Sequence, residues 1–309
     1  MAPRSTPRAR HVPIFARLSP LSPRGGLSAA AALVVAVVLA GSGSLSAAIT
    51  PTDSTPTVAA AALPQVHVQA TDYRYDMPAA VPAGLVTITQ TNSGAQPHQV
   101  VISRLKAGVS DQQMLDAFPG EEAKIDALST FAGGPGIVAP GGTQAVVVSL
   151  QPGRYVAYCF LPAPDGMAHF AKGMYRFFTV ARTSESVMSG QLAAQGTLNL
   201  RDFAFAVPTN GVAAGRTTLK VVNQGREPHE LVIAKVAAGK TVQDVITWVH
   251  TTPPSVPPPS PPPYIPAGGL EPIARGRRAG CCWTCSRANM SPSAMCGTPP
   301  PACRTSTSA

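Results

Sequence analysis

The body of this 309-residue chain has almost no cysteine. Five of the six cysteines lie in the last 29 residues, and only Cys159 lies elsewhere. A lone cysteine cannot form a disulfide within the part of the chain where it lies. Its side chain is therefore either a small buried group or a ligand, and its neighbours must decide between the two.

Net charge is also missing from the body of the chain. The whole sequence carries a formal charge of +9, but residues 64–182 hold eight basic and eight acidic side chains, and residues 183–274 hold six of each. The excess lies at the two ends, where residues 1–63 and residues 275–309 each contain five Arg and at most one acid. Because the central part has no basic excess, nucleic acid is excluded as an expected partner.

No stretch after residue 48 is long and apolar enough to span a membrane. The apolar run 27–40 follows five Arg and precedes small residues, with Ser46 and Ala48 at positions that suit cleavage. We therefore expect residues 1–48 to be a signal peptide or an N-terminal anchor. The expected location is secreted, periplasmic or cell-envelope, and membrane contact is expected only through an uncleaved anchor.

Short alternating runs rich in β-branched and aromatic residues dominate the sequence after residue 63, and Gly/Pro turns separate them. This pattern predicts an all-β fold, either a sandwich or a barrel. Residues 110–134 break the pattern, because Met114, Leu115 and Phe118 have helical spacing and Ser110 suits a helix cap. The sequence therefore predicts a short helical insertion between strands.

The chain then repeats itself. The two copies share landmarks that occur in the same order, namely Asp72/Asp202, Gly84/Gly215, Asn92/Asn223, His98/His229 and Gly108/Gly239. The repeat suggests a first β-sandwich domain and an incomplete second copy. The predicted segments are a leader (1–48), a linker (49–63), a first domain (64–182), a linker (183–196), a partial second domain (197–274) and a disordered tail (275–309).

The tail after residue 275 lacks the apolar strand that the repeat calls for. We interpret it as the product of a change of reading frame near residues 275–280, and we expect the second domain to be partly disordered. Sequencing the gene tests this interpretation. The pair Cys282 and Cys285, with Cys296 and Cys303, has an alternative reading as a zinc site.

Four residues in the first copy have the order that a mononuclear copper site requires. Such sites use two imidazoles and one thiolate in a plane, with a weak axial thioether. His98 follows a turn and precedes a strand, Cys159 ends the run RYVAYC, and His169 and Met174 follow in the next loop. Alternative readings are a turn histidine, a buried cysteine, a surface histidine and a core methionine, and Met167 is a rival axial candidate.

The segments TNSGAQPHQVVIS (91–103) and GRYVAYCFLPAPDGMAHFAKGMYRFFTV (153–180) resemble the ligand segments of plastocyanin-like cupredoxins. The resemblance covers residues 64–182 and, weakly, 197–274. It implies a Greek-key β-sandwich that holds one copper ion through His98, Cys159, His169 and Met174. The Cys–His loop is longer than in small cupredoxins and is similar to that of the type 1 centre of copper nitrite reductases. Asn92 either braces the ligand loops or forms a turn before Gly94.

The resemblance implies electron transfer with a redox partner protein. The alternatives are non-redox copper binding, with a copper donor or acceptor as the partner, and a metal-free interaction scaffold. Copper oxidases and nitrite reductases need further histidine ligands, whereas this chain has six His and no His-x-His pair. We therefore expect no enzymatic activity, and no complete metal site around His229.

Overall fold

The computed structural model describes residues 35–36, 57–58, 62–118, 122–188, 190–208, 215–252 and 261–285. Within these ranges no helix has the length and apolar character needed to cross a membrane. The predicted leader lies outside the described residues except for Val35–Ala36, and so does the tail after Cys285.

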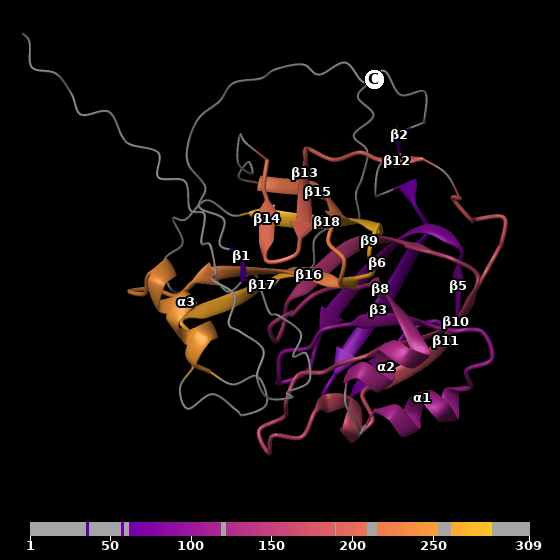
Figure 1. The fold of residues 1–309 in the computed structure, drawn as a ribbon, viewed down its shortest axis with the longest axis horizontal. Helices are drawn as coiled ribbons and strands as arrows, with labels where there is room; N and C mark the ends of the chain where they lie inside the picture. Colours follow the sequence, from indigo (N-terminus) through magenta and orange to yellow (C-terminus); the bar gives the residue numbers. More distant parts are fainter. Residues whose placement is uncertain are drawn as a thin grey trace, which may run out of the picture.

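Two mixed sheets of eight strands make up the fold, and each contains strands from both copies of the repeat (Figure 1). The order of the first sheet is β1 (Val35–Ala36), β16 (His229–Val236), β17 (Tyr264–Ile273), β8 (Ser129–Gly133), β7 (Val101–Leu105), β10 (Gly153–Tyr158), β11 (Tyr175–Ala181) and β5 (Ala80–Pro82). The order of the second is β14 (Ala204–Ala206), β13 (Gly196–Arg201), β15 (Gly215–Asn223), β18 (Arg278–Cys285), β9 (Thr143–Leu150), β6 (Gly84–Asn92), β3 (Gln65–Thr71) and β4 (Arg74–Asp76). A separate ribbon pairs β2 (Thr57–Val58) with β12 (Gln191–Leu192).

The side-chain alternation of the strands places one apolar core between the sheets. In β3, Val66, Val68 and Ala70 are buried while the residues between them are exposed or half-buried. The buried cluster continues through Val86 and Ile88 of β6 and includes side chains of the second copy. The prediction of an all-β sandwich with a short helical insertion is confirmed, because burial in the strands follows the period of two that strands require.

The helical insertion consists of α1 (Asp111–Ala117) and α2 (Glu122–Leu128). Ser110 caps α1 in a reciprocal pair with Gln113, which satisfies two amide groups at the start of the helix. Apolar side chains of both helices pack with those of β7 and β10 in a second cluster that includes Met114, Phe118, Ile125 and Tyr158. The insertion therefore covers the outer face of the sheet whose strand β10 leads into Cys159, the predicted thiolate ligand.

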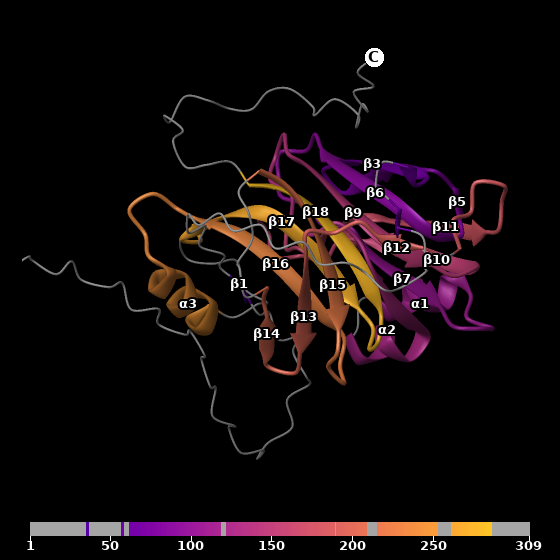
Figure 2. The same ribbon diagram turned by 90° about the horizontal axis from the view of Figure 1, so that it is seen from above.

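The two copies lie side by side and join edge to edge (Figure 2). Strands β9 and β18 pair antiparallel over four residue pairs, from Val148–Ala279 to Ala145–Cys282, and β17 adds one pair to β8. Helix α3 (Val242–Thr251) covers the second copy through Val245. The copies therefore share both sheets and do not form two separate sandwiches.

The expectation that the chain lacks structure from residue 275 onward is wrong for residues 278–285, which form β18. Its eight residues pair with β15 along their whole length and with β9 along half of it. Strand pairing uses backbone groups that any residue except proline supplies, and the small side chains of Ala279 and Cys281 fit the core. Counterparts of β10 and β11 are missing from the described residues of the second copy, and the free edge of β16 pairs with β1.

Candidate metal centre

Four chain segments meet at one end of the sandwich and bring the predicted ligands together. Strand β10 runs antiparallel to both β7 and β11, and Tyr158 at its end pairs with Val101 and Tyr175 at their beginnings. Cys159 follows β10 directly, while His98 precedes β7. His169 opens the short 3₁₀ helix η2 (His169–Lys172), and Met174 lies just before β11.

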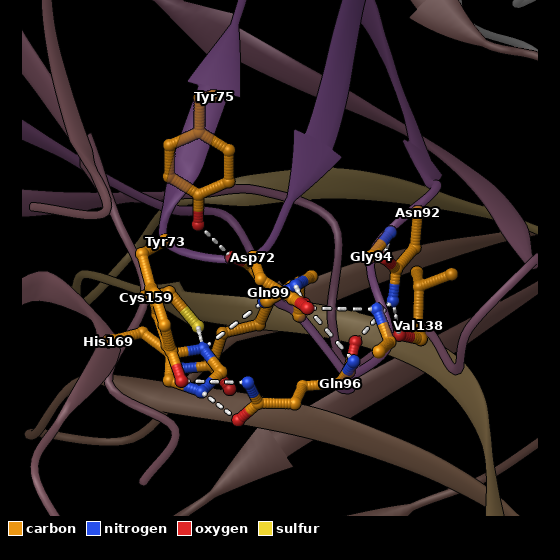
Figure 3. A network of polar contacts seen from close by, with 12 residues as sticks. Asp72, Tyr73, Tyr75, Asn92, Gly94, Gln96, Gln99, Val138, Cys159 and His169 are labelled. Carbon is orange, nitrogen blue, oxygen red and sulfur yellow. Dashed lines mark hydrogen bonds and ion pairs between the residues drawn. The ribbon is translucent and has the colours of Figure 1, made fainter. Parts of the chain in front are cut away.

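The donor atoms of His98, Cys159 and His169 all lie within 4.8 Å of one another. The two Nδ1 atoms are 3.1 Å apart, and Cys159 Sγ is 3.4 Å from His169 Nδ1 (Figure 3). All three side chains are buried, with exposed fractions of 0%, 0% and 1%. They form the one group of three or more possible metal ligands among the described residues.

Met174 and Met167 occupy very different environments. Met174 is fully buried in the same cluster as Cys159. Its backbone N–H donates to His169 O at 3.0 Å, and its carbonyl oxygen accepts from Cys159 N at 3.2 Å. Met167 is 50% exposed. The buried position of Met174 suits an axial thioether better than the surface position of Met167 does.

The long loop from Cys159 to Met174 is held by its own backbone hydrogen bonds. His169 N donates to Leu161 O and Phe170 N donates to Cys159 O, both at 2.9 Å. Gly173 ends η2 with a positive φ of 105°, a conformation that glycine adopts without steric cost. The additional length is therefore folded into a compact loop that returns His169 to Cys159.

Sequence reasoning missed the groups that hold the far side of each imidazole ring. Asp72 Oδ1 lies 3.0 Å from His98 Nε2, and Gln96 Oε1 lies 3.2 Å from His169 Nε2. Gln96 Nε2 donates to the hydroxyl of Tyr73, whose ring packs edge-on against His169 with centroids 5.2 Å apart. Asp72 had one signal in the sequence, because it is a landmark shared with Asp202.

These partners determine which ring nitrogens carry protons. Both Nε2 atoms face oxygen acceptors, so the protons lie on Nε2 and the lone pairs lie on Nδ1. Two lone pairs then face each other across 3.1 Å, beside a sulfur atom. That arrangement is unfavourable between neutral rings and is favourable around a cation, so this donor set fits a soft metal ion such as copper.

Asn92 has both of the predicted roles. Its Nδ2 group donates to Gln96 O at 2.8 Å and to Val138 O at 2.9 Å, which ties together two loops beside His98. Its Oδ1 atom accepts from Gly94 N at 2.8 Å, which forms the turn. Asn223 makes the equivalent contacts in the second copy.

Burial changes the pKa of the three titratable donors, Cys159, His169 and His98. It raises the pKa of the Cys159 thiol to about 12. It lowers the pKa of His169 to about 4, with a further contribution from nearby His98. Burial also lowers the pKa of His98, and the Asp72 carboxylate partly offsets this. At neutral pH the metal-free centre therefore holds two neutral imidazoles and a protonated thiol, and a bound cation must displace the thiol proton.

The remaining candidates do not form a second centre among the described residues. His229 Nε2 lies 2.9 Å from Asp202 Oδ1, and within the described part of the chain no cysteine or second histidine joins this pair. Cys281 is buried in the core, where its Sγ lies 3.5 Å from Gly269 O. The side chains of the zinc-like tail motif, Cys282 through Cys303, lie outside the described residues.

No family model and no curated protein matches the sequence. Among solved structures, the chain is similar to reduced auracyanin from the photosynthetic bacterium Roseiflexus castenholzii at 27% identity, covering 38% of this chain and 96% of that one, with a TM-score of 0.26. Auracyanin A, a "blue" copper protein of Chloroflexus aurantiacus, matches at 17% identity over 38% of this chain and 99% of that one (TM-score 0.26). A copper nitrite reductase from Nitrosomonas europaea matches at 12% identity over 75% of this chain and 86% of that one (TM-score 0.23).

Proposed function

We propose that the chain is an exported protein that binds one copper ion and transfers electrons. His98 and His169 supply the imidazole ligands, Cys159 supplies the thiolate and Met174 supplies the axial thioether. The observation that carries the proposal is the convergence of two Nδ1 atoms and one Sγ atom within 4.8 Å in a buried position. Two nitrogens and a thiolate, with a weak thioether, form the donor set of electron-transfer copper sites.

The surroundings of the donors favour electron transfer over catalysis. Each ligand adjoins a strand end or lies in a loop tied by backbone hydrogen bonds, so the geometry changes little when copper changes its charge. The described residues supply no second group of metal ligands for a catalytic copper. The partner is then a redox protein, and a copper donor or acceptor is the alternative if copper is held without cycling.

The test is the visible spectrum of the full chain after addition of Cu(II). A strong thiolate-to-copper band that disappears in Cys159→Ser supports the proposal. Cys281→Ser is the matched control, because Cys281 is also a buried cysteine but forms no group with two imidazoles among the described residues. Tight Cu(I) binding without the band would indicate a copper carrier, and binding of neither ion would leave a metal-free scaffold.

A further inference from the structure

We propose that Asp72 is a positioning residue for the copper centre, because its carboxylate holds the Nε2 proton of His98 and keeps Nδ1 unprotonated and directed at the ion. The inference rests on the proposed function and names a residue outside the ligand set. Asp72 lies at the tip of the β3–β4 hairpin, far in sequence from His98 but 3.0 Å from its ring.

The loop that carries His98 fixes the orientation of the Asp72 carboxylate. Ala95 N donates to Oδ2 at 3.1 Å, and Gln96 N donates to Oδ1 at 3.2 Å. Backbone amides can only donate, so the two oxygens must be acceptors at these positions. The oxygen beside His98 Nε2 is therefore an acceptor as well, and the ring nitrogen must be the donor.

Gly94 is required for this close approach. A Cβ atom at Gly94 would overlap Asp72 Oδ1 and would lie 2.7 Å from His98 Nε2. A larger residue at position 94 would push the carboxylate and the ring apart. Asp72, Gly94 and His98 therefore form one packed unit, and Figure 3 shows Asp72 and Gly94 within the polar network.

The second copy contains the same unit. Asp202 Oδ1 lies 2.9 Å from His229 Nε2 and accepts from Arg226 N at 2.8 Å, and a Cβ at Gly225 would overlap both side chains. No cysteine or second histidine lies with His229 among the described residues. The structure thus supplies a matched control, in which the same contact is present without the other ligands.

The contact affects copper because imidazole has two neutral tautomers. A ring that carries its proton on Nδ1 cannot bind a metal through that atom, and a partner of the other nitrogen selects the tautomer. A carboxylate partner also makes the ring a stronger donor. A stronger donor stabilises Cu(II) more than Cu(I), because Cu(II) carries more charge.

The experiment compares Asp72→Asn with Asp202→Asn in the full chain. Asparagine has one acceptor oxygen, so at position 72 it either loses a backbone donor or turns an NH₂ group toward Nε2. In the metal-free protein, ¹⁵N NMR of the ring should show His98 protonated on Nε2 in the wild type and a mixture of tautomers in D72N. Copper affinity should fall about 10- to 100-fold in D72N, and the reduction potential should rise. A tenfold loss confined to Cu(II) corresponds to about 59 mV.

D202N should leave copper affinity and potential at wild-type values. Equal losses in both variants would overturn the proposal, because they would indicate general loosening of the fold. Wild-type protonation of His98 on Nδ1 would also overturn it, even if D72N does not fold. If the wild type binds no copper, the proposed function fails, while the NMR comparison still decides whether Asp72 selects the tautomer.

Discussion

Glu271 offers the sharpest test of the structure away from the metal ligands. This β17 side chain from the second copy is only 4% exposed, and its Oε2 atom has no hydrogen-bond partner among the described residues. Burial raises its pKa well above the ordinary value of 4.5, and nearby Glu230 on β16 raises it further. Glu271 in turn contributes to the raised pKa values of Tyr75 on β4 and of Cys159.

The raised pKa makes the free energy of unfolding depend on pH. The folded protein keeps the Glu271 proton at pH values where the unfolded chain has released it, so stability is fully present below pH 4.5 and is lost as pH rises toward the folded pKa. The loss is about 1.4 kcal/mol per pH unit for one proton. Over the three units from pH 5 to pH 8 it reaches at most about 4 kcal/mol.

Glu271→Gln removes this dependence, because glutamine has the shape of the protonated acid and does not ionise. Urea unfolding of the metal-free protein, followed by circular dichroism at pH 5, 6, 7 and 8, gives the difference between variant and wild type. The difference should favour the variant and should grow with pH. The histidine contributions cancel, since both proteins contain the same histidines. Exposed Glu185→Gln is the control for loss of one carboxylate. A difference that stays constant or shrinks with pH would refute the reasoning.

Three further predictions follow from the site and its loops. Met174→Leu should keep the fold, at a cost under about 1.5 kcal/mol, but should shift the reduction potential, whereas exposed Met167→Leu should not; voltammetry of both variants decides the axial ligand. Asn92→Ala leaves two backbone carbonyls without their donor and should cost about 1–3 kcal/mol in thermal or urea unfolding. Gly134→Ala should prevent stable folding, because the added Cβ would overlap the backbone carbonyl oxygen of Val100. Gly108 has a positive φ but open space around it, so Gly108→Ala should lower the free energy of unfolding by only about 1–2 kcal/mol. Soluble yield and unfolding curves compare the two variants.

The candidate site could be predicted largely from sequence because Cys159 and Met174 directly adjoin strands with a strong local pattern and His98 lies close before another. The run before Cys159 and the Pro-His turn before β7 are local signals, and the antiparallel pairing of β7 and β10 then brings their ends together. The Asp72–His98 contact joins residues 26 positions apart. Only the repeated Asp and His landmarks pointed to it.

The joining of the two copies could not be predicted in the same way. Pairing of β9 with β18 connects residues more than 130 positions apart and uses backbone groups, which leave no mark on residue type. The sequence of β18 has no alternation of large apolar side chains, so the apolar pattern gave no strand there. Strand β18 is instead held in place by backbone pairing with β15 on one side and β9 on the other.

The hydrogen bonds that shape the histidine loop occur in both copies of the repeat. The bonds of Asn92 and Asp72 recur at Asn223 and Asp202, in a copy where the described residues offer no thiol beside the histidine. Backbone and side-chain hydrogen bonds therefore stabilise the same loop geometry in both copies. Under the proposed function, copper would meet one preformed imidazole, and the loop from Cys159 to Met174, held by its own backbone hydrogen bonds, would supply the other ligands. A site preformed in this way has little to rearrange when an electron arrives, which is the property that an electron carrier requires.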